Sequence, residues 1–225
     1  MKKVYILLSQ KKWHDDLFNS LSKNKNQKWI RINQKKDFNF ELLQKLKPKF
    51  IMIPHWSFII SEKIFTDFNC IVFHMTNLPY GRGGSPLQNL IVRGHKETVI
   101  SAIKVIKGID TGPIYLKHKL ELDGTALEIF KRSAKIILNM INQIIDKEIS
   151  PINQSGEVTV FKRRSPELSD ISNLESLEEV YNYIRMLDAD GYPSAFLETK
   201  NLRIEFDKAQ LINNKLKSNV TIIKK

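Results

Sequence analysis

The sequence predicts an α/β fold in which a mostly parallel sheet is flanked by helices. Short apolar runs that suit buried strands recur along the first half of the chain, and amphipathic segments of helical period separate them. Strands that alternate with helices in this way form parallel sheets through right-handed crossovers. Ligands of such sheets bind at the carboxyl ends of the strands, so the loops that follow the strands are where function is expected.

The elements follow in a regular order. Buried strands are expected at residues 4–8, 29–32, 50–54 and 70–73, with helices at residues 13–21 and 40–46 between the first three. Pro86 and Gly94 bracket a further helix at 86–93, because proline suits a first helical turn and glycine ends a helix. Strands at 98–107 and 114–122 flank a turn-rich break, and a long amphipathic helix is expected at 125–147.

The amino-acid composition of the chain changes after residue 150, where glycine, proline and serine interrupt a polar stretch. A helix at 174–187 and short strands near 195–197 and 202–204 are expected beyond it. We therefore predict a main domain over residues 1–150 and a short C-terminal α+β appendage over residues 151–225 that packs on it.

Composition limits the partners and the location. The net charge is +12, but the lysines are scattered, and the densest cluster is Lys162-Arg163-Arg164. Such a surface suits nucleic-acid phosphates or an anionic small substrate, so charge alone does not choose between them. Cys70 lies in an apolar run and is expected to be a buried, reduced thiol. Together with the lack of any apolar run of about 18 residues, this favours a cytoplasmic protein without a membrane span.

The most informative stretch runs from His74 to Pro86. It places a titratable ring at a strand end, then a loop with Pro79, Arg82 and several glycines, and a second turn follows at Asp110-Thr111-Gly112. Two strand-end loops of one sheet can bring His74 and Asp110 together, whereas a lone histidine is more often a structural residue. A carboxylate beside an imidazole orients the ring, and the pair can move protons or stabilise a developing oxyanion.

Other kinds of chemistry have weaker support. The remaining histidines (His14, His55, His95 and His118) show no metal-ligand spacing, so no metal site is expected. The chain has neither a nucleophile elbow nor a phosphate-binding P-loop, and no glycine follows the first strand as a dinucleotide fingerprint requires.

The pattern His-x-x-x-Leu-Pro-x-x-Arg-Gly-x-x-Pro, followed by Asp-Thr-Gly, resembles the folate-dependent formyltransferases over about residues 50–125. The resemblance implies a Rossmann-like fold, N10-formyltetrahydrofolate as the formyl donor, and catalytic positions at His74 and Asp110. It also implies that the donor is bound by residues of three loops, namely His55, Trp56, Ser57, Phe58, Leu78, Pro79, Arg82, Gly83, Gly108 and Ile109.

One position departs from the family pattern. The family has asparagine two residues before the histidine, and this chain has Val72, which can neither donate nor accept a hydrogen bond. Asn77 and Asn89 are the candidates to replace that donor; otherwise His74 stabilises the oxyanion alone, or the chain is catalytically impaired. Loss of one such donor costs on the order of 3 kcal/mol in the barrier.

The tail resembles that of small nucleotide-sugar N-formyltransferases of the pseudaminic-acid type. The resemblance implies formyl transfer to the amine of a nucleotide-linked amino sugar, with Tyr80, Arg163, Arg164 and Tyr192 as substrate-binding residues. A nucleic-acid partner is not expected on this interpretation, and a homodimer is allowed for. The alternatives are a methionyl-tRNA-type formyltransferase, and an impaired protein that only binds folate or a sugar nucleotide.

Overall fold

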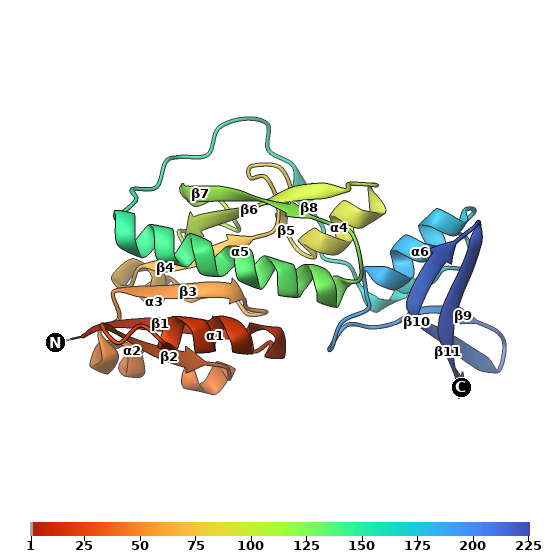
Figure 1. The fold of residues 1–225 in the computed structure, drawn as a ribbon, viewed down its shortest axis with the longest axis horizontal. Coiled ribbons are helices and arrows are strands. Elements are labelled where there is room, and N and C mark those ends of the chain that lie inside the picture. The colour runs from red at the N-terminus through yellow and green to blue at the C-terminus, as the bar shows by residue number, and fades with distance from the viewer. Residues whose placement is uncertain (1) are drawn as a thin grey trace. The chain divides into compact units, whose positions relative to one another are not determined.

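The structure, a computed structural model, describes residues 2–225 and contains a six-stranded sheet (Figure 1). Its strands are β1 (Lys3–Ser9), β2 (Gln27–Ile32), β3 (Phe50–His55), β4 (Cys70–His74), β6 (Glu97–Lys104) and β7 (Ile114–Glu121). The order across the sheet is β2-β1-β3-β4-β6-β7. β1 pairs in parallel with β2 and β3, β3 pairs in parallel with β4, and β6 runs antiparallel to β4. The predicted α/β fold with a mostly parallel sheet is confirmed.

Helices connect and cover these strands. They are η1 (Lys12–His14), α1 (Asp15–Ser22), η2 (Lys35–Asp37), α2 (Phe40–Leu46), α3 (Glu62–Asp67), α4 (Pro86–Val92), α5 (Ala126–Lys147), η3 (Pro166–Ser169) and α6 (Leu177–Arg185). The remaining strands are β5 (Arg82–Gly83), β8 (Val160–Phe161), β9 (Ala195–Glu198), β10 (Leu202–Ile212) and β11 (Lys215–Lys224). β5 pairs with β8, and the last three form an antiparallel sheet in the order β11-β10-β9.

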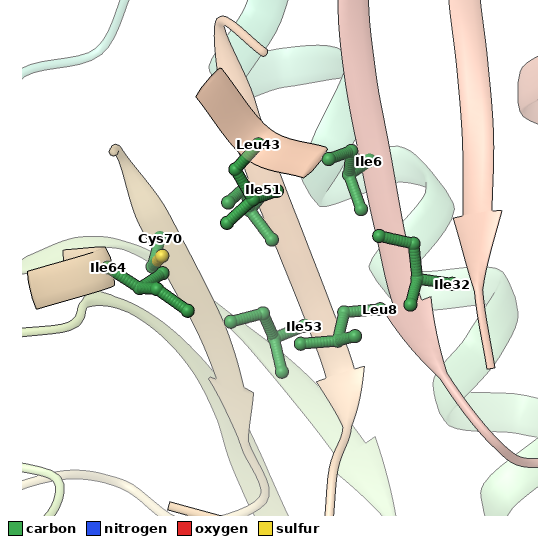
Figure 2. Packing of buried hydrophobic residues seen from close by; sticks show 8 residues of the cluster. All are labelled: Ile6, Leu8, Ile32, Leu43, Ile51, Ile53, Ile64 and Cys70. Atoms are coloured by element: carbon green, nitrogen blue, oxygen red, sulfur yellow. The ribbon is translucent and has the colours of Figure 1, made fainter. Parts of the chain in front are cut away.

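The sheet is buried on both faces, as its apolar strands require. On one face, Leu43 of α2 and Ile64 of α3 pack with Ile6, Ile51 and other strand residues in a cluster that Figure 2 shows from close by. Side chains alternate along a strand, so Tyr5 and Leu7 point to the opposite face, and both are buried. Figure 1 shows α5 lying along the sheet.

The chain divides into two compact units. The first contains the chain up to Arg82 together with Val99–Leu120 and Lys131–Val160, and it holds most of the six-stranded sheet. The second contains Gly83–Thr98, Glu121–Phe130 and Phe161–Lys225, with α4, α6 and the antiparallel sheet. The domain boundary expected near residue 150 stays a prediction.

Several elements differ from the sequence expectation. The strand expected at 98–107 ends at Lys104, the strand expected at 202–204 continues to Ile212, and α3, β5, β8 and β11 were not anticipated. Lys104 N donates to Pro113 O at 2.9 Å, so the segment between them leaves the sheet as a separate turn. This turn carries Asp110.

A buried histidine near the start of the chain makes the fold sensitive to acid. His14 is 1% exposed, and its Nδ1 lies 2.6 Å from Ser9 Oγ. Burial lowers the pKa of His14 to about 3, with smaller contributions from the positive charges of His55, Arg31 and Lys11. The unfolded chain therefore binds a proton at this ring below its ordinary pKa of 6.5, while the folded chain binds it only near pH 3.

We expect the free energy of unfolding to fall by about 2 kcal/mol between pH 7 and pH 5 because of this one group. Urea unfolding of the wild type and of His14→Gln at both pH values measures this, since carboxylates titrate alike in the two proteins. The variant should lose that much less stability on acidification. Equal losses in the two proteins would show that His14 does not stay neutral in the folded state.

Candidate active site

His74 is the last residue of β4, and its ring is almost fully buried. Its Nε2 lies 2.8 Å from Gly81 O. A backbone carbonyl can only accept, so Nε2 must carry the hydrogen in this contact. The other ring nitrogen, Nδ1, is therefore the one left for chemistry.

Asp110 meets that nitrogen. Its Oδ2 lies 3.5 Å from His74 Nδ1, with the His74 side chain 7% exposed and the Asp110 side chain 16% exposed. Asp110 sits in the turn between β6 and β7 with a φ of 53°, a left-handed conformation that few residues other than glycine, asparagine and aspartate adopt. The expected approach of the two side chains is observed. The pair can share a proton at Nδ1 and exchange it with a reactant that enters beside it.

The loop after His74 is held by polar contacts at several points. Ser101 Oγ donates to Thr76 O at 2.7 Å and accepts from Leu78 N at 3.3 Å. Lys117 Nζ donates to Asn77 Oδ1 at 2.6 Å and to Leu78 O at 2.7 Å. These contacts fix the loop that places Gly81 O against the histidine ring.

The residues expected to bind the donor lie on the loops that follow β3, β4 and β6. β3 and β4 are parallel neighbours, so His55 and His74 end adjacent strands. Phe58 is 38% exposed beside Trp56, with their ring centroids 5.4 Å apart, and Ser57 is exposed between them. Ile109 is 68% exposed, and it follows Gly108 in the Asp110 turn.

Other expected donor-binding residues are occupied within the protein. Leu78 and Pro79 are buried, and Pro79 O accepts from Thr159 N at 3.3 Å. Gly83 belongs to the second unit, where an added Cβ would lie 2.4 Å from Phe161 O. Arg82 directs its guanidinium to Gln154 Oε1, with Nε at 3.1 Å and Nη2 at 2.8 Å. The donor-binding roles of these residues stay predictions.

Gln154 is a residue that sequence reasoning missed. Besides accepting from Arg82, it donates through Nε2 to Asp110 O and to Gly112 O, each at 2.8 Å. It lies in the polar stretch between α5 and β8, where no periodicity or motif distinguishes one polar residue from the next.

The residues expected to bind the acceptor are divided between the two units. Tyr80 lies in the His74 loop of the first unit, whereas Arg163, Arg164 and Tyr192 belong to the second. Arg164 stacks on Tyr183 at 5.2 Å and donates to Leu168 O. Tyr192 stacks on Phe130 at 5.6 Å, and burial raises its pKa to about 12. Arg163 is exposed.

The two candidates to replace the missing asparagine differ in their contacts. Asn89 Nδ2 donates to the backbone carbonyls of Gly84, Ser85 and Lys162, and its Oδ1 accepts from Arg93. Its amide therefore has a structural role in the second unit, so Asn89 does not replace the donor. Asn77 is exposed in the His74 loop and stays the candidate.

Other sites have no support in the part of the chain that the structure describes. No cluster of three or more histidine, cysteine, aspartate or glutamate side chains among residues 2–225 is arranged to hold a metal ion. Cys70 is buried, and burial raises the pKa of its thiol to about 12. Over the same residues, no helix combines the length and apolar character needed to cross a membrane.

The comparison with known proteins places the chain in a family. The family model described as "Formyl transferase" matches residues 6–135, and the model described as "Methionyl-tRNA formyltransferase, C-terminal domain" matches residues 166–223. The chain therefore belongs to the formyl transferase family of enzymes.

Solved structures support the fold. The structure of a methionyl-tRNA formyltransferase from Clostridium thermocellum is 48% identical, with a TM-score of 0.95 over 99% of this chain and 100% of that one. HypX from Aquifex aeolicus, in complex with tetrahydrofolic acid, shares the fold at 14% identity, with a TM-score of 0.76 over 91% of this chain and 37% of that one.

A curated methionyl-tRNA formyltransferase from Clostridium beijerinckii is 26% identical over 194 residues, which is 83% of this chain and 62% of the relative. The chain thus spans less than two thirds of the length of that relative.

These relatives correct the expected partner. The sequence favoured a nucleotide-linked amino sugar and no nucleic acid, whereas the similar proteins carry the name of an enzyme that acts on methionyl-tRNA. The expectation was wrong because the motifs around His74 and Asp110 predict catalysis and donor binding but not the identity of the acceptor. The acceptor was inferred only from the likeness of the tail.

Proposed function

We propose that this chain transfers the formyl group of N10-formyltetrahydrofolate to the amine of an aminoacyl-tRNA, with methionyl-tRNA as the acceptor. The juxtaposition of His74 Nδ1 and Asp110 Oδ2 at 3.5 Å in a member of the formyl transferase family carries this proposal. The names of the relatives favour the tRNA acceptor over the amino sugar. The net charge of +12 agrees with a polyanionic partner. A cytoplasmic location stays part of this proposal.

Residues of the loops after β3 and β6 fit the donor. Phe58 and Ile109 expose apolar surface on two loops of the first unit, which also holds the polar pair, and a flat heterocycle with a polar reacting end needs both kinds of contact. His55, Trp56, Phe58, Gly108 and Ile109 would hold the donor. When bound, it supplies the formyl carbon that the acceptor amine attacks.

The roles of His74 and Asp110 follow from which of their atoms can accept or carry a proton. The amine must lose a proton as it attacks, and the Asp110 carboxylate, beside Nδ1, accepts that proton directly or through the ring. A proton on Nδ1 stabilises the negative charge that develops on the formyl oxygen. The bond between the formyl carbon and N10 would then break, and N10 would take a proton back from the pair as tetrahydrofolate leaves. Gly81 O holds Nε2 throughout, so the ring keeps its orientation while Nδ1 exchanges its proton.

The direct test is incubation with N10-formyltetrahydrofolate and methionyl-tRNA, followed by release of the amino acid and mass measurement. We expect a gain of one formyl group that depends on the donor, with no gain on free methionine. A known methionyl-tRNA formyltransferase serves as the positive control. Absence of formylmethionine while the control is active would overturn the acceptor, and folate binding without any transfer would support the impaired alternative.

A further inference from the structure

Gln154 uses its whole hydrogen-bonding capacity inside the first unit. Its Nε2 gives both hydrogens to backbone carbonyls, those of Asp110 and Gly112, and its Oε1 receives Nε and Nη2 of Arg82. Carbonyls only accept and a guanidinium only donates, so the orientation of the amide is fixed by chemistry. Among side chains of this length, only that of glutamine ends in an amide, which offers two donor hydrogens on Nε2 and two acceptor sites on Oε1.

These contacts complete a closed circuit around the reacting pair. His74 Nδ1 faces Asp110 Oδ2, Asp110 O accepts from Gln154, and Gln154 accepts from Arg82. Arg82 follows Gly81, whose carbonyl holds His74 Nε2. Gln154 is thus linked to Nδ1 of the ring through Asp110, and to Nε2 through Arg82 and Gly81. Together these links set the separation between the ring and the carboxylate.

The Asp110 turn needs such a restraint. Asp110 has a φ of 53°, in the left-handed region that favours glycine. Gln154 binds the carbonyls on both sides of Thr111, so it holds the strained residue from its backbone and leaves the carboxylate to face the ring.

We infer that Gln154 is a positioning residue that fixes Asp110 against His74 by linking the Asp110 turn to Arg82. The inference rests on the proposed function for its kinetic consequence, whereas its structural consequence can be measured without any transfer of formyl. Gln154 bonds backbone carbonyls of the turn and the Arg82 guanidinium, so it acts on the reaction through the turn and the loop that carry the pair.

Two substitutions distinguish the bonds of Gln154 to the Asp110 turn from its bonds with Arg82. Gln154→Met removes every hydrogen bond at nearly the same length, and Gln154→Glu keeps an acceptor for Arg82 while it faces the Asp110 and Gly112 carbonyls with oxygen. We expect each to lower kcat by about 10- to 100-fold, because small misplacements of reacting groups are costly. The KM for the donor should stay within about twofold. Asn153→Ala changes the exposed neighbour in the chain and should leave both constants unchanged.

A double-variant cycle tests the route of action. If Gln154 acts through Asp110, Gln154→Met should cause no further loss of kcat in an Asp110→Ala background. A full additional loss there would overturn the inference, because the glutamine would then act independently of the carboxylate.

The last readout needs no activity. At one fixed pH, the 15N signals of the His74 ring should shift in Gln154→Met and Gln154→Glu relative to the wild type, and should not shift in Asn153→Ala. Unchanged ring signals in both Gln154 variants would overturn the positioning role. If the ring signals shift in the Gln154 variants but the wild type transfers no formyl group, the positioning role is upheld and the proposed function is overturned instead.

Discussion

Replacement of His74 by alanine is expected to lower kcat for formyl transfer by at least about 10²-fold, which is the lower range for a positioned acid–base group. The substitution removes the nitrogen that faces Asp110 at 3.5 Å. Asp110→Asn should have an effect of similar size, because an amide cannot take the proton of the attacking amine. Asparagine tolerates the left-handed conformation at this position, so the turn should keep its shape.

Steady-state kinetics and thermal unfolding separate catalysis from folding in these variants. His118→Ala is a matched control, since His118 lies on β7 and its Nε2 contacts Gln143 Nε2 at 3.3 Å. If His74 and Asp110 act as a unit, the double variant should be no slower than the slower single variant. Activity close to that of the wild type in either single variant, measured with an acceptor that the wild type formylates, would reject the assignment.

The sequence identified both residues of the pair but not the path that brings them together. His74 ends an apolar run, and Asp110 lies in a glycine-rich break between two strands. The expectation that they meet treated both loops as strand ends at one edge of a parallel sheet. β6 instead runs antiparallel to β4, and Val105 N just after its end donates to Cys70 O at the start of β4. Asp110 reaches His74 through the path of the turn after Lys104, which no periodicity predicts.

Gln154 could not be found in the same way. It is 44 residues away from Asp110 in sequence and 72 away from Arg82. Its segment belongs to no strand or helix, so no periodicity predicts where the side chain lies. Contacts of this kind depend on the path of an irregular segment, which is set by the packing of the whole unit.

The missed hairpin had a signal in the sequence. Asn213 and Asn214 join β10 to β11, with φ values of 50° and 56°, and Ile212 pairs with Lys215 across them. Two consecutive asparagines with positive φ are typical of the tight turn that suits a two-residue hairpin. The strand after them begins with the polar run Lys215-Leu216-Lys217-Ser218-Asn219, and that polarity concealed it.

A second large effect is expected from Gly112→Ala. A Cβ at this position would lie 1.7 Å from Lys104 O and 2.9 Å from its carbonyl carbon, so the turn or the end of β6 has to move. The moving segment carries Asp110 and the carbonyl that Gln154 binds. We expect kcat to fall by about 10²-fold, as a displacement of about 1 Å can cost. The free energy of unfolding should fall by about 1–3 kcal/mol.

Gly94→Ala is the control for this substitution, because alanine is unfavourable at the two positions for different reasons: a steric clash at Gly112 and a positive φ at Gly94. Gly94 has a φ of 77° with nothing within 4 Å of an added Cβ, so alanine there strains the backbone without a clash. It should cost roughly 1 kcal/mol of stability and leave kcat unchanged. Urea unfolding and kinetics on both variants test this. A Gly112→Ala protein with the kcat of the wild type would mean that the Asp110 turn can move without effect, and that the separation of His74 and Asp110 does not control the reaction.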